Sequence, residues 1–348
     1  MVDGAYRMRE PSFEDALKVL LLQAADEGRG EALFGESLAR AASEAPPFVV
    51  GEQFPDVYLE CPLSGSPFLD VTVLYSRLEP GTRVDHPAAV GTKAMLDWFA
   101  ETCRDLPGVC CGFELDAKEP ELPAAAVHFQ PREHADLVRP FCESVGEPER
   151  ADLYLELAER MPEGWSPSFF GMFRGRPGSP LRVCGYLDDA ERKACAEDPC
   201  HLAQRFDSIG FPTYKSAMLE QVSALMDKAP VAVDYQFDVF SDGRLGPTFA
   251  IDVQFGIEQP ETVLETFEGG AGADIMRLLE GWSAADDRWK VAVRSAFACA
   301  IPVELADGGV DMFAFALMPR WVKARWTDGT LQPAKLYQLA HAGVFEAA

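Results

Sequence analysis

Basic residues are scarce in this chain of 348 residues. It has 31 lysines and arginines against 56 aspartates and glutamates, which gives a formal net charge of −25. Nucleic acids and anionic membranes attract basic surfaces, so this balance argues against either as a partner. A local basic pocket inside an acidic shell remains compatible with it.

Long apolar runs are also missing. The best one, Leu17 to Ala25, is far shorter than the roughly 20 residues that span a bilayer. The start of the chain, up to Asp15, is polar and lacks the basic and then apolar pattern of a secretory signal. We therefore expect a cytoplasmic protein that contacts no membrane.

Metal-binding and nucleotide-binding patterns are absent as well. The nine cysteines are scattered without a CxxC, and the five histidines follow no ligand spacing. Together with the missing signal, this usage predicts reduced, buried thiols and no protein-bound metal. The pairs Asp188-Asp189 and Asp286-Asp287 begin no DDxxD motif, so they indicate helix starts or solvated faces. The segment 241–247 contains glycine but matches no phosphate-binding loop, so it indicates a hairpin turn.

The chain does contain five pairs of short apolar-rich runs, each pair joined by a turn rich in Gly, Pro or Asp. Such pairs predict β-hairpins. They lie at 57–61 with 68–75, 111–115 with 125–130, 169–173 with 181–187, 233–240 with 248–255, and 312–317 with 334–339. Within the fifth pair, 320–332 is compatible with an extension of either strand or with a long basic loop. Helical periodicity separates the pairs, at 89–103, 134–145, 151–160, 201–209, 214–228 and 261–282.

The strands have one polar and one apolar face. In 181–187, Arg182, Cys184 and Tyr186 share a face, and aliphatic residues occupy the other. The same alternation recurs at 248–255. Since an open sheet of ten strands would leave edges and one face uncovered, closure under a layer of helices is favoured.

We therefore predict an α+β fold: a ten-stranded antiparallel β-barrel surrounded by helices, with a solvated lumen. The predicted barrel domain is 46–348, preceded by a helical extension at 1–45. An α+β enzyme of two separate domains, in which the hairpins do not close, is the alternative.

Five successive α-β-β-α units of this kind resemble the ABBA, or PT-barrel, prenyltransferases, and the spacing is most similar to the cyanobactin-type peptide prenyltransferases. The resemblance covers most of the chain from about residue 50 onward. Three short runs carry it, in order: 57–60 (VYLE) in the first strand, 112–116 (GFELD) in the second hairpin, and 335–337 (KLY) in the last strand. The resemblance implies isoprenyl transfer from an allylic diphosphate, dimethylallyl or geranyl, to a nucleophilic side chain of a peptide. It also implies Mg²⁺ that assists the diphosphate.

Two positions differ from that family. Where it has an arginine on the second strand of hairpin one, this chain has Asp70 and Thr72, and where it has a basic residue in hairpin two, this chain has His128 and Gln130. These differences are compatible with a weaker or relocated diphosphate site, with a changed donor, or with a barrel that has lost catalysis and binds a peptide or small hydrophobic ligand.

Prenyl transfer needs cations for the diphosphate, aromatic faces for the allylic cation, and a base for the nucleophile. Bidentate guanidinium contacts suit phosphate oxygens, and aromatic rings stabilise cations. Glu60 is the predicted base, because it faces the lumen from the first strand. The predicted diphosphate ligands are Arg182, Lys323, Arg325, Lys335, Tyr186 and Tyr337. The predicted lumen residues are Tyr58, Thr72, His128, Gln254 and Trp321.

Overall fold

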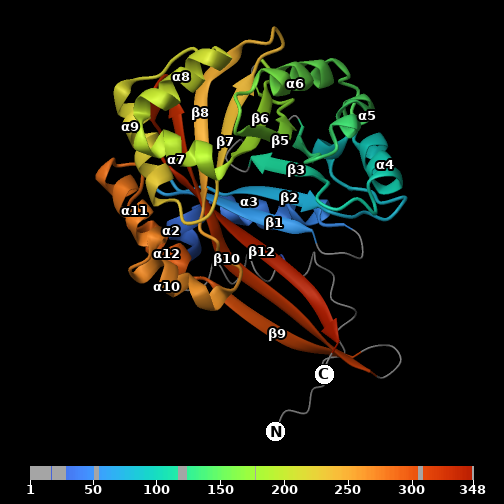
Figure 1. Ribbon diagram of the computed structural model, residues 1–348. Coiled ribbons are helices and arrows are strands. Elements are labelled where there is room, and N and C mark those ends of the chain that lie inside the picture. The colour runs from blue at the N-terminus through green and yellow to red at the C-terminus, as the bar shows by residue number, and fades with distance from the viewer. Residues whose placement is uncertain are drawn as a thin grey trace.

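The computed structural model describes residue 17 and residues 29–50, 55–116, 124–176, 178–304 and 309–346. The strands of this part alternate with helices along the chain (Figure 1). They are β1 (Asp56–Pro62), β2 (Asp70–Tyr75), β3 (Cys110–Asp116), β4 (Ala126–Gln130), β5 (Trp165–Met172), β6 (Leu181–Leu187), β7 (Val233–Val239), β8 (Leu245–Gln254), β9 (Phe297–Glu304), β10 (Val310–Thr327), β11 (Thr330–Leu331) and β12 (Lys335–Glu346).

Ten of these strands form a closed antiparallel barrel. The order is β10, β12, β1, β2, β3, β4, β5, β6, β7 and β8, and β8 pairs back onto β10. The register places Glu60 opposite Tyr337 and Lys323 opposite Asp252. The predicted barrel is confirmed, and the alternative of two separate domains with unclosed hairpins is wrong.

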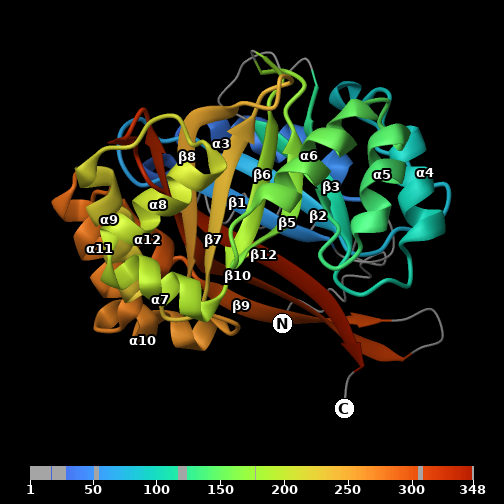
Figure 2. The same ribbon diagram turned by 45° about the horizontal axis from the view of Figure 1, so that its top comes forward.

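The fifth hairpin is longer than predicted. β10 is one strand of 18 residues, so 320–327 extends the first strand and is not a loop. Its second half, Trp321 to Thr327, pairs with β8 and closes the barrel, whereas the predicted run 312–317 pairs with β9 and β12 beyond the barrel. A register shift between Pro319 and Trp321 separates the halves. β9, β10 and β12 continue past the barrel as a ribbon (Figure 2).

The helices lie on the outside of the barrel (Figures 1 and 2). They are α2 (Arg29–Phe34), α3 (Ser37–Glu44), α4 (Lys93–Thr102), α5 (Val138–Ser144), α6 (Glu149–Arg160), α7 (Asp189–Glu197), α8 (Pro199–Ile209), α9 (Ser216–Lys228), α10 (Val263–Glu268), α11 (Ala271–Gly281) and α12 (Arg288–Arg294), with short 3-10 turns at 46–48, 87–89, 135–137 and 260–262.

Two helix predictions need correction. The predicted helix 261–282 is broken at Gly269 and Gly270, because two glycines favour the unfolded backbone and end α10 before α11 begins. No helical range was predicted for α7 or α12, although the acidic pairs before them were interpreted as helix starts or solvated faces. Asp188 caps α7 by accepting a hydrogen bond from the Glu191 amide at 2.8 Å, and Asp286-Asp287 precede α12, so the expected helix starts are found at both acidic pairs.

The hydrophobic core lies between the barrel wall and the helices, not inside the barrel. In β1, Val57, Leu59 and Cys61 are fully buried on the outward face, while Tyr58 and Glu60 point into the lumen. This period of two recurs around the barrel. The lumen is therefore lined by the polar set of residues.

The N-terminal segment packs against the barrel where the structure describes it. Phe34 of α2 and Phe48 belong to the main core, and α2 contacts α12 and β1. The rest of the predicted extension, 1–28 apart from Leu17, lies outside the described residues. The boundary at residue 46 stays a prediction.

All nine cysteines are free thiols. Five are buried as expected, whereas Cys200 is exposed and the other three, Cys110, Cys184 and Cys299, are half-buried. Burial raises the pKa of the Cys61 thiol to about 12, so it stays protonated. Across the described ranges, no helix combines the length and apolarity that a membrane crossing requires.

Candidate active site

The barrel encloses a cavity of about 310 Å³, here called the main cavity. Each of the ten barrel strands contributes to its lining. One residue from each strand, in the order β1 to β8, β10 and β12, is Tyr58, Thr72, Glu114, His128, Phe169, Tyr186, Asp234, Asp252, Trp321 and Tyr337. A hollow lined from every side is a place where a small molecule is largely removed from water.

A second, smaller hollow adjoins the main cavity and contains five cationic side chains. We call it the cationic chamber and define it by Arg176, Arg182, Lys323, Arg325 and Lys335. Six residues line both spaces and form the boundary between them, namely Glu60, Glu114, Arg182, Gln236, Lys323 and Tyr337. The chamber lies toward the Arg325 end of the barrel, and the main cavity extends toward the opposite end, at Arg320.

Every site residue predicted from sequence lines one of these two spaces. Glu60, Arg182, Lys323 and Tyr337 line both. Arg325 and Lys335 line the cationic chamber alone, and the remaining six line the main cavity, namely Tyr58, Thr72, His128, Tyr186, Gln254 and Trp321. What each residue does there stays a prediction.

Arg325 is the cation with the least compensation in the chamber. Among the described residues its guanidinium makes no hydrogen bond or ion pair, whereas Arg182 donates to Asp238 at 2.9 Å and Arg176 to Glu114 at 3.1 Å. Partial desolvation and the neighbouring Arg182 lower the pKa of Arg325. Its side chain is nevertheless exposed, so the guanidinium is open to an incoming anion.

One aromatic ring supports two of these guanidiniums. The guanidinium carbon of Arg176 lies 4.0 Å from the ring centroid of Phe173, and that of Arg182 lies 4.2 Å from it. Stacking on a ring face fixes the plane of a guanidinium and leaves its N–H edge free for other ligands. Phe173 therefore holds two arginines as neighbours despite their like charge.

Glu60 lies in a hydrogen-bonded network at the boundary of the two spaces. It accepts from Thr72 Oγ1 at 2.9 Å and from Lys335 Nζ at 3.3 Å, and its side chain is 3% exposed. Lys335 also donates to Asp70 at 2.5 Å. Burial opposes the charged amine, but Asp70 and Glu60 outweigh it and raise the pKa of Lys335. Asp70 stands at a position where the resembled family has an arginine. In this chain it contacts a cation from β12, Lys335.

An aromatic row runs along the lumen beside Glu60. Tyr58 and Trp321 have ring centroids 4.7 Å apart, and Trp321 stacks on Tyr337 at 5.0 Å. Lys323 lies over the Tyr337 ring at 4.7 Å and donates to its hydroxyl at 2.8 Å. The row offers π-faces next to the cationic chamber, where they can stabilise a cation and exclude water.

On β7 and β8, acidic groups face the main cavity. Asp234 and Asp252 are cross-strand neighbours, and Gln254 donates to Asp234 at 2.8 Å. Burial, reinforced by the neighbouring carboxylate, raises the pKa of Asp234 to about 7. Burial also raises the pKa of Asp252 to about 6, against the effect of Lys323.

His128 and Glu114 form a buried pair on the opposite wall. His128 Nε2 lies 3.3 Å from Glu114 Oε2, and its ring stacks on Phe169 at 5.1 Å. Although burial disfavours a carboxylate, His128 and Arg176 hold the pKa of Glu114 well below its usual range. Glu114 thus joins His128 to the cationic chamber.

The sequence analysis missed Arg176 and Glu114 as site residues. Glu114 lies in the run 112–116 that carried the resemblance. It is four residues from Cys110 on the same face of β3, and both line the lumen, so strand alternation would have identified it. Arg176 lies in the turn between β5 and β6, which was assigned only as a turn. Two arginines flanking one glycine in a hairpin turn, Arg174 and Arg176, were the available signal.

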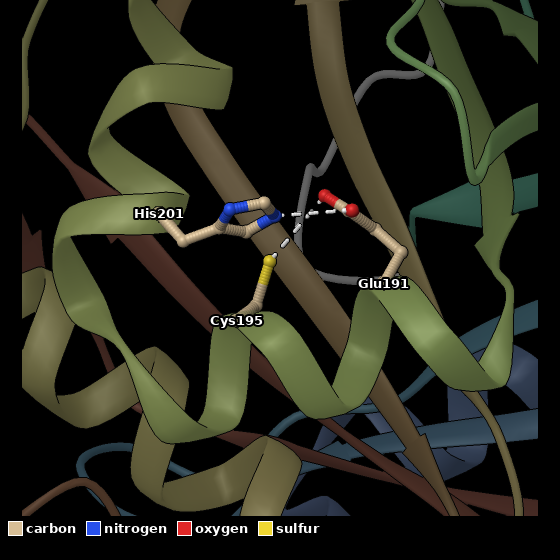
Figure 3. A group of neighbouring side chains, drawn as sticks. All are labelled: Glu191, Cys195 and His201. Atoms are coloured by element: carbon tan, nitrogen blue, oxygen red, sulfur yellow. Dashed lines mark hydrogen bonds and ion pairs between the residues drawn. The ribbon is translucent and has the colours of Figure 1, made fainter.

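Outside the barrel, Glu191, Cys195 and His201 lie close enough to suggest a metal site (Figure 3). Glu191 is already occupied, because Arg205 donates to both of its oxygens at 2.8 Å and Trp165 donates at 2.9 Å. Burial raises the pKa of Cys195 to about 12, so its thiolate is disfavoured. These groups fit a structural junction between α7, α8 and β5 rather than a metal centre.

Comparisons with known proteins agree with the fold. No protein-family model and no curated sequence matches the chain. Among solved structures, 5-dimethylallyltryptophan synthase from Streptomyces coelicolor superposes with a TM-score of 0.54 at 12% identity, over 96% of this chain and 98% of its own. AnaPT from Neosartorya fischeri gives 0.47 at 11% identity, over 95% and 92%. PriB with product diphosphate gives 0.47 at 11%, over 94% and 96%. Because the identity to the Streptomyces coelicolor enzyme is only 12%, this likeness establishes the architecture alone: the chain has the PT-barrel fold.

Proposed function

We propose that the protein is a prenyltransferase that moves an isoprenyl group from an allylic diphosphate to a nucleophilic acceptor. The cationic chamber carries this proposal, because five cationic side chains open directly onto an aromatic-lined cavity in a PT barrel. The similar Streptomyces coelicolor structure is named for dimethylallyl transfer to tryptophan, which supports a dimethylallyl donor here.

The diphosphate would lie against Arg182, Arg325 and Lys323, with Arg176 and Lys335 beside it. As the allylic C–O bond breaks, its electron pair stays with the diphosphate oxygen, and these cations stabilise the charge that develops there. Tyr337 remains a proposed hydroxyl partner and is supported by its contact to Lys323. Tyr186 lines the main cavity and not the chamber, so we do not retain it as a diphosphate ligand.

The allylic cation would form beside Tyr337 and Trp321, whose stacked rings shield it from water. The acceptor then forms a new bond to the allylic carbon and loses a proton. Glu60 is the proposed proton acceptor, because it lies between the aromatic row and the cationic chamber and has Thr72 and Lys335 to position it.

Among the described residues, the chamber offers no unpaired carboxylate to Mg²⁺. Its three carboxylates are each paired with a base: Glu60 with Lys335, Glu114 with Arg176, and Asp238 with Arg182. The residues therefore do not fit a protein-held Mg²⁺, which prefers free carboxylate and water ligands. The proposal assigns any Mg²⁺ to the diphosphate itself.

For the acceptor we retain a peptide side chain, on the order and spacing of the cyanobactin-type motifs. A free aromatic amino acid is the second class, favoured by the tryptophan named for the similar structure. A cytoplasmic location belongs to the same proposal and is supported by nine free cysteines.

Donor binding tests the proposal directly. Dimethylallyl thiodiphosphate, which does not react, should raise the melting temperature of the protein, and Arg325→Gln should weaken its binding by about tenfold. Arg244→Gln is the matched control, because Arg244 lies on an exposed turn. An unreactive barrel that binds peptide or hydrophobic ligand would show neither stabilisation nor any effect of Arg325.

A further inference from the structure

The β7–β8 wall of the main cavity presents hydrogen-bond acceptors without donors. Asp234 Oδ1, Asp252 Oδ1 and Gln236 Oε1 are buried, and no described residue donates to any of them. Gln236 is 5% exposed and lines the cavity with both aspartates. A buried acceptor without a donor is costly, so three of them on adjacent strands indicate a group that arrives from outside the chain.

The charges on this wall are unequal. Asp252 has one cation close by, with Lys323 Nζ at 3.6 Å, and that amine already donates to Tyr337. Asp234 has no ion pair with a described residue, and its bonded oxygen is taken by the neutral Gln254. Among the described residues, a partly committed lysine is therefore the one cation in ion-pair contact with these two carboxylates, while Arg132 and Arg182 act on them from farther away. A ligand group with a positive charge and several N–H donors would supply both the missing charge and the missing hydrogen bonds.

This wall extends beyond the donor's place. Asp234, Asp252 and Gln254 line the main cavity and not the cationic chamber, whereas Gln236 lines both and marks where the two spaces meet. Trp321 is the cross-strand neighbour of Gln254, so an aromatic face adjoins the acidic groups. A ligand held here would have its reactive part beside the aromatic row and near Glu60.

We propose that Asp234, Asp252 and Gln236 bind a cationic N–H group, ammonium or guanidinium, of the acceptor substrate. This assignment rests on the proposed function, and it narrows the acceptor class to molecules with a positive charge near the nucleophile. The ammonium of an aromatic amine and the guanidinium of a peptide arginine share the required chemistry. Both donate several hydrogen bonds from one charge.

Two pairs of probes test the charge by isothermal titration calorimetry. Tryptamine is compared with its neutral analogue 3-propylindole, and acetyl-Trp-Arg-amide with acetyl-Trp-citrulline-amide. The charged member of at least one pair should bind about tenfold more tightly than its neutral partner. Preference in the first pair identifies a free amine, and preference in the second identifies a peptide side chain. Equal binding in both pairs would overturn the inference.

The substitution Asp234→Asn should remove that preference while changing dimethylallyl thiodiphosphate binding by less than about twofold. Asp242→Asn, on an exposed turn beyond β7, is the matched control and should leave the preference intact. If Asp234→Asn disturbs folding, Gln236→Leu tests the same site through a neutral residue. A preference that survives both substitutions places the cation elsewhere and contradicts the proposal.

Magnesium is the competing ligand for two neighbouring carboxylates. Tryptamine binding that is abolished by millimolar MgCl₂ in the native protein, but not in Asp234→Asn, would show a metal site instead. All these readouts are binding measurements. A protein that prefers charged probes but transfers no isoprenyl group would support this inference and refute the proposed function. A protein that transfers the isoprenyl group but shows no preference for charged probes would support the proposed function and refute this inference.

Discussion

Glu60 is held by Thr72 and Lys335, and removing its charge should affect chemistry more than folding. Glu60→Gln keeps the size and the Thr72 contact but cannot take a proton. Turnover should fall by about tenfold or more while the melting temperature stays close to that of the native protein. Product formation followed by mass spectrometry, with circular dichroism for the fold, provides the measurement. Unchanged turnover would remove Glu60 from the mechanism.

Phe173 touches two arginines and should act through them. Phe173→Leu retains an apolar side chain but loses the ring face under Arg176 and Arg182, where each stacking contact is worth about 0.5–1 kcal/mol or more. We expect donor affinity to drop by about fivefold to thirtyfold with little change in acceptor affinity. Separate titrations of the two substrates give this split, and a loss shared equally by both would indicate general disruption of the barrel.

At the scale of elements, strands β2 and β3 approach too closely for a side chain at one point. A Cβ on Gly112 would lie 1.9 Å from the carbonyl oxygen of Val73. Gly112→Ala should therefore destabilise the protein by about 1–3 kcal/mol, because the two backbones must separate. Urea unfolding measures the change. Gly246→Ala in β8, where the nearest atom is at 3.4 Å, is the control and should cost much less.

Elements set by local alternation were predictable, and those set by distant pairing were not. The parity of 181–187 placed Arg182 and Tyr186 in the lumen correctly, because strand side chains alternate whatever their neighbours are. The partner of 312–317 was not predictable, since β9 has a weak signal in sequence and the register shift near Pro319 is a tertiary feature. Arg176 was missed because a turn residue has no parity.

At the scale of the whole molecule, buried acids control stability against pH. Burial raises the pKa of the Asp234 carboxyl to about 7 and that of the Asp252 carboxyl to about 6, against an ordinary value of 3.8. Between these values the folded state holds more protons than the unfolded state, so the free energy of unfolding falls as pH rises from about 4 to about 7. Each such group contributes at most about 1.4 kcal/mol per pH unit to this slope.

Glu191 changes the free energy of unfolding in the opposite direction, and it does so at lower pH. Burial alone would raise the pKa of Glu191, but hydrogen bonds from Arg205, Trp165 and His201 outweigh it and hold the value at about 2. Its contribution is present above its unfolded value and is lost as pH falls toward 2. Chemical unfolding from pH 3 to 8 should therefore show a maximum near pH 4–5. Asp234→Asn should reduce the slope of the unfolding free energy against pH only on the side above this maximum. An unchanged slope there would contradict the raised pKa of Asp234.

The cationic chamber and the main cavity extend toward opposite ends of one tube, with Glu60 and Tyr337 between them. The two products therefore need not leave through the same end of the barrel. If diphosphate leaves from the Arg325 end, it does not have to pass the larger product in the main cavity. Neither departure has to wait for the other, so initial-rate kinetics should follow a random order, and neither product should trap the other inside.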